Sequence, residues 1–318
     1  MKSKACLQAY QMLEVNGLKT GLKSLLWSAA ALVMLISLIV PALNILTVAL
    51  MMVPFVVLYT TLTRKEFALH LFAVLGIGFF VLGPAALILG LFFVIPSIVM
   101  GHMYKRQAQA RTVLTVVLLT ILGQLLLQLV LFSAVLDVSL TREIGQLIRG
   151  SVTELSSQGL LPASWSTEMT ESLIRTMVQS IPLTFIVIAF LYAVITHWVA
   201  RNALRRLHGL EIPGLKPAKE WMMPKILVLY YLIALVLDLI VTDDGDSFLN
   251  VVLLNLIPLL RLVFTIQAIG FFYYLADQKR WNKVVPVLLS IPVFLFPPLS
   301  LIGVLDVAFP IRKSFKKP

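Results

Sequence analysis

The chain has 318 residues, of which 59% are hydrophobic and 13% are charged. Soluble domains carry about 25% charged residues and a smaller apolar share, so this composition excludes a soluble enzyme, a secreted domain and a disordered chain. The net charge of +11 arises from 26 Lys and Arg against 15 Asp and Glu. The composition predicts an all-α protein, a polytopic transmembrane helix bundle.

Apolar stretches long enough to cross a bilayer, about 20 residues each, recur along the whole chain. We expect about 8 to 10 membrane segments, some of them short or broken by Pro and Gly. The expected segments cover residues 22–40, 43–62, 67–81, 84–103, 112–137, 180–200, 224–242, 248–276 and 284–309.

These segments are interpreted as a single integral membrane domain. The lipid bilayer is therefore the first expected partner of the protein. The parts of the domain are N-terminal helices over 22–138, an extracytoplasmic element over 139–179, C-terminal helices over 180–309 and a basic tail over 310–318.

The 139–179 element is the only sizeable polar excursion. Apolar residues recur at helical spacing over 140–156, which predicts an amphipathic helix. Ser164 or Ser166 can cap a second helix that leads into the next segment. We interpret the element as a lid or a packing unit.

Lys and Arg concentrate in alternate gaps between the expected segments. Positive residues favour short cytoplasmic loops, so these gaps and the N-terminus are predicted to be cytoplasmic. The basic groups lie in the N-terminal tail and around residues 64–65, 105–111, 201–225 and 279–283. Because topology accounts for the positive charge, no nucleic-acid partner is expected.

Two long apolar stretches contain helix breakers. Gly83-Pro84 interrupts residues 67–103, and Pro297-Pro298 interrupts 284–309, where an interior Pro removes a backbone hydrogen bond. We expect 284–309 to form two short helices, which would return the C-terminus to the cytoplasmic side. A single kinked helix is the alternative, since Pro is tolerated in membrane helices.

Five short stretches carry a resemblance to a known family. They are Ser180-Ile-Pro182, residues 200–207, Ile212-Pro213-Gly-Leu, Glu220-Trp221-Met-Met-Pro224 and residues 303–313. Together they resemble the YybS-like family of uncharacterised bacterial membrane proteins. The N-terminal part is also similar to the substrate-binding subunits of energy-coupling-factor vitamin transporters, at Pro41, Pro54 and Gly83-Pro84. The resemblance implies a multi-pass protein of the bacterial cytoplasmic membrane without an established activity.

Motifs for catalysis are missing from the sequence. It has no phosphate-binding Gly-rich loop, no His-Glu-x-x-His and no Gly-x-Ser-x-Gly. The single cysteine, Cys6, cannot form an internal disulfide, and the four histidines are too scattered to predict a metal site. We therefore expect no enzyme activity, no catalytic residues, no cofactor and no metal.

Arg261 is the outstanding charge within a membrane segment. At 1.5 Å per residue it lies about 20 Å from either end of 248–276, near the middle of the bilayer. Asn250 and Thr265 fall on the same helix face, which should point into the bundle. A charge at this depth costs at least about 2.5 kcal/mol unless it is paired or hydrated.

Two interpretations of Arg261 remain open. It could be the counter-charge for an anionic ligand. It could instead pair with Asp238 or Asp306, or bond to backbone carbonyls that Pro258 leaves free.

A second polar stripe lies on the 112–137 segment. Thr120, Gln124 and Gln128 follow each other at intervals of four residues. They could line a ligand pocket together with Arg261 or hold neighbouring helices together by hydrogen bonds.

Two function hypotheses follow. The first is small-molecule binding or transport through a midplane polar pocket lined by Arg261, Asn250, Thr265, Gln124 and Gln128. The alternative is a non-transporting scaffold that docks partners through 139–179 and the cytoplasmic loop 201–225. That loop, with its Lys and Arg residues, could also follow anionic lipid headgroups or contact a protein partner.

Overall fold

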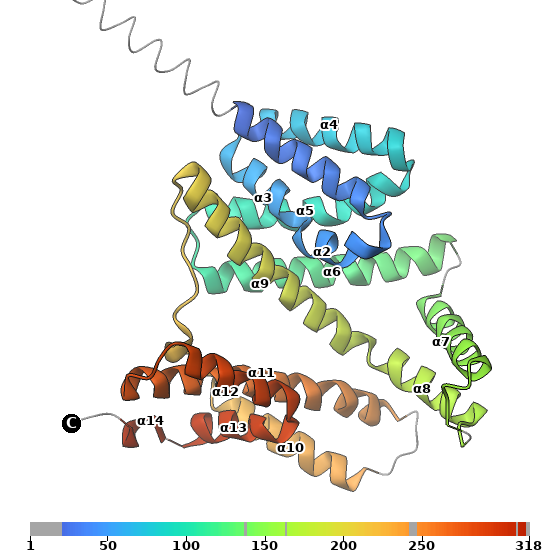
Figure 1. Cartoon of the computed structure of the whole chain (residues 1–318), viewed down its shortest axis with the longest axis vertical. Coiled ribbons are helices and arrows are strands. Elements are labelled where there is room, and N and C mark those ends of the chain that lie inside the picture. Colours follow the sequence, from blue (N-terminus) through green and yellow to red (C-terminus); the bar gives the residue numbers. More distant parts are fainter. Residues whose placement is uncertain (1–20, 137–138, 163, 242–246, 310, 316–318) are drawn as a thin grey trace, which may run out of the picture. The chain divides into compact units, whose positions relative to one another are not determined.

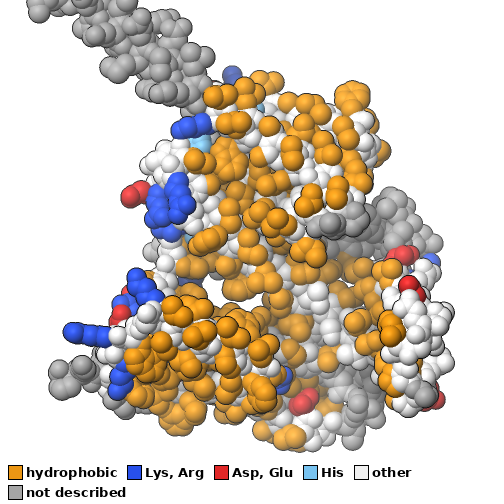
Figure 2. All heavy atoms as spheres, in the orientation of Figure 1, with side chains coloured by type: hydrophobic (Ala, Val, Ile, Leu, Met, Phe, Trp, Pro, Cys, Tyr) orange, Lys and Arg blue, Asp and Glu red, His pale blue; other side chains and the backbone are white. Residues whose placement is uncertain are grey.

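The computed structural model describes residues 21–136, 139–162, 164–241, 247–309 and 311–315, and every regular element in them is a helix (Figure 1). This confirms the all-α prediction. Six helices are long and apolar enough to cross a membrane, and four shorter apolar helices accompany them. On the face shown in Figure 2, hydrophobic side chains cover much of the surface, as expected for helices that meet lipid.

The chain divides into two compact units, which are treated separately below. The first draws on Met1–Val130 and Ile186–Leu215, and the second on Leu131–Phe185 and Lys216–Pro318. Two of the three boundaries fall within helices, α6 (Ala110–Leu136) and α9 (Ile181–His208), and the third follows Leu215 in the segment between α9 and η1 (Ala218–Glu220). Each unit therefore contains part of both helices.

The first unit is built around a short helix, α3 (Met52–Thr61), most of which is buried. Its helices, besides the parts of α6 and α9, are Gly21–Ser37, α2 (Pro41–Leu50), α3, α4 (Arg64–Leu82) and α5 (Ala85–Lys105). Every side chain from Met52 to Leu58 is buried, and α3 packs against α5. The helix is interrupted between α2 and α3 for a local reason: Pro54 has no N–H to donate to the carbonyl of Leu50.

The break expected at Gly83-Pro84 is confirmed. Helix α4 ends at Leu82, Gly83 has a φ of 66°, and α5 begins directly after Pro84. A positive φ costs glycine little, and Pro is tolerated where the first helical N–H groups lack partners. At its other end α4 begins with a capping box between Thr63 and Glu66.

The second unit contains two groups of helices. The first group is α7 (Leu140–Ser157) and α8 (Thr167–Gln179), which confirm the two helices expected in the 139–179 element. The second group is η1 (Ala218–Glu220), α10 (Ile226–Ile240), α11 (Phe248–Lys279), α12 (Val284–Leu295), η2 (Pro297–Ser300), α13 (Leu301–Ala308) and α14 (Ile311–Ser314).

Helices α7 and α8 pack together through a paired charge. The Nε and Nη2 atoms of Arg149 donate to the two carboxylate oxygens of Glu171, each at 2.9 Å. Ser166 caps α8 by accepting a hydrogen bond from the N–H of Met169. The two helices keep apolar side chains exposed, including Leu147 and Met169, as an amphipathic surface element does.

The stretch 284–309 forms two short helices that turn back on themselves. Helix α12 starts just after α11 ends, and α13 runs back toward that same end of α11 (Figure 1). Gly303 lies against the backbone of Phe264, and farther along the Tyr274 hydroxyl donates to the carbonyl of Arg312 at 2.8 Å. The pair of short helices is therefore confirmed, whereas its cytoplasmic side stays a prediction.

The prediction of a loop over residues 201–225 is wrong for residues 201–208, which are helical. Helix α9 continues to His208, so Arg201, Arg205 and Arg206 lie on its last turns. Cations are favourable near a helix C-terminus, and their long stems can reach out of the apolar layer. The helix ends before Gly209, whose φ of 66° suits a glycine beyond a helix end.

We expect the contact between α7 and α8 to weaken in acid. The hydrogen bond from Arg149 lowers the pKa of the Glu171 carboxyl from its ordinary value of 4.5. The charged pair therefore contributes stability above that value, and the contribution is lost as the pH falls through the lowered pKa. Pulsed EPR distances between spin labels on α7 and α8 should broaden only at the acidic end of a titration. The same acid broadening in Glu171→Gln would contradict this prediction.

Replacing Gly303 should destabilise the second unit. A Cβ at this position would lie 1.9 Å from the Phe264 carbonyl oxygen, and backbone atoms of a packed helix cannot move aside. Gly303→Ala should cost about 1–3 kcal/mol of unfolding free energy. Thermal unfolding in lipid nanodiscs measures the effect. Gly76→Ala is the control, because nothing lies within 4 Å of its added Cβ; equal losses in the two variants would refute the close contact.

Candidate functional site

A buried carboxylate organises the end of the second unit. Asp306, on α13, is 1% exposed. One oxygen accepts from Arg312 Nε at 2.9 Å, and the other accepts from Arg312 Nη2 at 2.6 Å and from Gln267 Nε2 at 2.5 Å. Such charge-assisted, bidentate contacts are the strong class of hydrogen bond.

The same network reaches the segment that precedes α10. Arg312 donates to the carbonyls of Lys219 and Trp221, both at 2.9 Å. The Oε1 atom of Gln267 accepts from the N–H of Met223 at 3.0 Å. The guanidinium also lies 4.9 Å from the ring centre of Tyr274, a cation–π distance. The chain after α13 and the segment around η1 are thus both fastened to α11.

A cavity of about 310 Å³ opens beside this network. Met222, Met223, Val307 and Phe309 give it apolar walls, and its charged lining comes from Lys225, Asp306, Arg312 and Lys313. Its volume is at the lower end of the range of small-molecule pockets.

Arg261 lies half-buried on α11, in the same unit. Its side chain makes no hydrogen bond or ion pair with any residue that the structure describes. Thr265 is buried one turn later and donates its hydroxyl proton to the Arg261 carbonyl at 2.9 Å. Asp306 is engaged by Arg312, and Asp238 is exposed near the end of α10. Asn250 lies in the first turn of α11, which leaves it some distance from Arg261 along the helix.

The glutamine stripe belongs to the first unit. The structure therefore places Gln124 and Gln128 in a different unit from Arg261. The Oε1 atom of Gln124 is buried and has no hydrogen-bond partner among the residues described. Gln128 is half-buried, and Thr120 donates to the carbonyl of Val116 at 2.8 Å.

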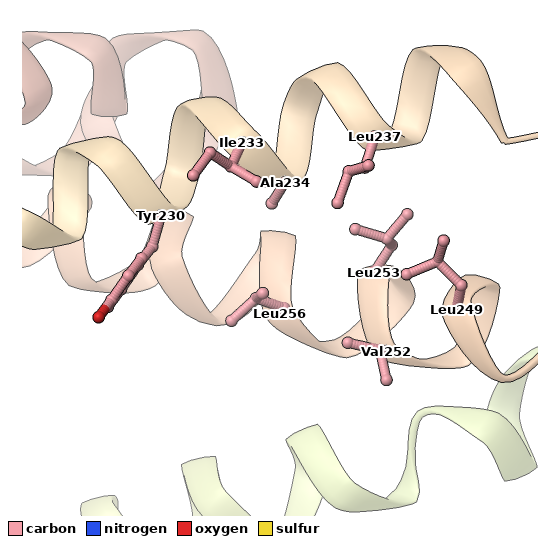
Figure 3. Close-up of a pocket in the computed structure, with 8 residues that line it drawn as sticks. All are labelled: Tyr230, Ile233, Ala234, Leu237, Leu249, Val252, Leu253 and Leu256. Atoms are coloured by element: carbon pink, nitrogen blue, oxygen red, sulfur yellow. The ribbon is translucent and has the colours of Figure 1, made fainter.

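An apolar groove of about 190 Å³ runs between α10 and α11 (Figure 3). Tyr230 and Ile233 line it from α10, and Leu249, Leu253 and Leu256 line it from α11. Apolar walls offer dispersion contacts but cannot orient a polar solute. The groove therefore suits a hydrocarbon chain and does not extend the polar site.

Three further polar contacts were not predicted from the sequence. In the first unit the Tyr104 hydroxyl lies 2.9 Å from His197 Nδ1, with both side chains buried. In the second unit Asn255 accepts from the N–H of Leu183 at 2.9 Å and donates to the carbonyl of Gln179 at 2.8 Å. The Gln267 contact with Asp306 completes the set. Polar pairs of this kind hold membrane helices together.

Comparison with known proteins places the chain in a family. The model of the family described as "Predicted membrane protein (DUF2232)" matches residues 28–307. The chain belongs to the DUF2232 family. It is 24% identical over 305 residues to the "Uncharacterized protein YybS" of Bacillus subtilis (strain 168), an alignment that covers 92% of this chain and 97% of that protein. No solved structure matches the chain.

These matches confirm the YybS-like resemblance and the multi-pass membrane class. The family match ends at residue 307, so it includes α11 and most of α13 with Gln267 and Asp306, but not Arg312. The likeness to energy-coupling-factor subunits stays a prediction.

Breaking the Asp306–Arg312 pair should destabilise this DUF2232 protein strongly. The two side chains are 0% and 13% exposed, so Asp306→Ala leaves a poorly solvated guanidinium without its counter-charge, at a cost of about 3–5 kcal/mol. Adding Arg312→Met to this variant should restore much of the loss, because neither charge then remains. Thermal unfolding in nanodiscs measures both variants.

The control for this prediction is the exposed pair Lys219–Asp277. Its atoms lie 2.9 Å apart, but its side chains are 41% and 47% exposed. Asp277→Ala should therefore cost at most about 1 kcal/mol. A loss as large as that of Asp306→Ala would show that burial is not the cause.

Proposed function

We propose that this protein binds a small anionic solute within the membrane and carries it across, with Arg261 as the counter-charge. One observation carries the proposal: a guanidinium in the middle of a 32-residue apolar helix has no hydrogen bond or ion pair within the described part of the chain. Arg261 lies about 20 Å from the start of α11 at 1.5 Å per residue.

The energetic argument concerns an uncompensated charge. A lone Arg at the centre of a membrane helix costs about 2.5–3.5 kcal/mol on insertion scales. Arg312 in the same unit bonds to a carboxylate and two carbonyls, whereas Arg261 has no such bond to any described residue. A bound anion would supply the missing counter-charge, and a planar guanidinium can hold a carboxylate or phosphate through two hydrogen bonds.

The turn between α12 and α13 supports the same location. Gly303 lies against Phe264, which is one turn after Arg261 on α11. The short helix η2 comes just before Gly303 in the chain. Helix α11 packs against η2 as well as α13. Interrupted helices in transporters commonly place free backbone groups around a substrate near the bilayer midplane.

The alternative function is a scaffold that uses the α7–α8 element. Its favouring observation is the exposed apolar surface of these helices, where Leu147 of α7 is 71% and Met169 of α8 is 49% exposed. Such a surface fits either the membrane interface or a protein partner. Under this alternative the protein would bind no solute at Arg261.

A thermal-shift screen tests the transport proposal. Organic and inorganic anions are added to the protein in nanodiscs, and a binder at 100 times its Kd should add about 2.7 kcal/mol of stability. Arg261→Gln should abolish the shift, and Arg261→Lys should retain part of it, since Lys keeps the charge without the planar fork. Uptake of the stabilising anion into proteoliposomes then tests movement across the membrane.

Arg142→Gln is the matched control, because it removes an exposed charge from α7 and should leave the shift unchanged. If no anion stabilises the wild type, the proposal fails. Chemical crosslinking that then recovers a protein partner through α7–α8 would favour the scaffold.

A further inference from the structure

The cavity beside the Asp306 network has the charge pattern of an anion site. It opens where α10 begins, at Ile226, and where α13 ends, at Ala308. Because both helices are apolar, we expect these two ends to lie near the level at which hydrocarbon gives way to headgroups. This location differs from that of Arg261, which lies near the middle of α11.

The negative charge of Asp306 in the cavity is already paired with the positive charge of Arg312. Both oxygens of Asp306 are occupied by Arg312, and one of them also by Gln267. Lys225 and Lys313 line the same cavity and are exposed. In the described ranges neither ammonium group has a hydrogen bond or ion pair. The cavity therefore presents two uncompensated positive charges.

The walls of the cavity are apolar and partly open. Met222 is 54% exposed and Phe309 is 57% exposed, which is costly in water but favourable against acyl chains. A lining that combines cations with apolar side chains matches an amphiphile rather than a freely soluble ion. The N-terminus of α10, with Lys225 as its N-cap, adds a partial positive charge on the same side.

We propose that this cavity is a specific site for the phosphate headgroup of an anionic phospholipid, held between Lys225 and Lys313. Arg312 lines the site while its hydrogen bonds keep it fixed on Asp306, so it supports the local field without swinging to the ligand. Basic pockets between membrane helices bind anionic headgroups in this way. The bound lipid would also brace the segment before α10 against the chain that follows α13.

Native mass spectrometry with thermal unfolding tests the site. The full-length protein is prepared in phosphatidylcholine nanodiscs with and without phosphatidylglycerol. We expect the wild type to retain phosphatidylglycerol and to unfold at a higher temperature in its presence. In Lys225→Gln/Lys313→Gln the apparent affinity for phosphatidylglycerol should fall roughly tenfold or more, since each surface Lys contributes about 1 kcal/mol toward anionic lipid.

Two control variants separate the site from general charge and from misfolding. Lys279→Gln/Lys283→Gln removes two exposed charges outside the cavity and should leave the retention unchanged. Lys225→Arg/Lys313→Arg keeps both charges and should retain the lipid. If the Lys279/Lys283 variant loses as much lipid, or if the Arg variant loses it, the site is refuted.

Inorganic phosphate and glycerol 3-phosphate distinguish a lipid from a soluble phosphate. If either stabilises the protein in phosphatidylcholine as well as phosphatidylglycerol does, the lipid assignment is wrong. Arg261→Gln should not change phosphatidylglycerol retention. The lipid site can therefore fail or hold independently of the proposed solute site.

Discussion

The buried carboxylate of Asp306 is the constraint on which the second unit depends. A carboxylate in an apolar helix costs several kcal/mol unless charge and hydrogen bonds compensate it. Arg312 and Gln267 supply that compensation, and both lie on helices other than α13, which carries Asp306. Satisfying one charge therefore fixes the position of α13 on α11 and the path of the chain after α13. The carbonyls of Lys219 and Trp221 bring the segment before α10 into the same arrangement.

The turn at η2 is compatible with the membrane for a related reason. Unpaired backbone groups are costly in hydrocarbon, and non-helical backbone persists there only when protein or a polar cavity covers it. Pro297 and Pro298 have no N–H, so the turn has fewer donors to satisfy. Gly303 then allows α13 to approach the backbone of α11 closely enough to bring Asp306 beside Gln267. The turn and the charged network thus depend on each other.

Hydropathy predicted the membrane helices, although α9 runs on to His208, beyond its expected end. Gly and Pro residues predicted where the long apolar stretches are interrupted. Gly83-Pro84 and Pro297-Pro298 act locally, so their effect is visible in the sequence. The Asp306 network could not be predicted from the sequence in this way. Asp306 and Arg312 are six residues apart across a helix end, whereas side chains that meet on one helix face are three or four residues apart. Gln267 is 39 residues from Asp306, and Tyr104 is 93 from His197. Hydropathy carries no information on such distances, which are set by helix packing.

Two arginines of the second unit, Arg261 and Arg312, differ in how far the surrounding protein compensates their charge. From the sequence, Arg261 is notable because it lies in the middle of an apolar segment, whereas no role was predicted for Arg312 in the basic tail. In the structure Arg312 has a carboxylate, two carbonyls and an aromatic ring around it, so its role in the fold is accounted for. Arg261 has the deeper position and no such contacts among the described residues. A cation whose cost the fold does not offset is the place where a ligand would contribute most.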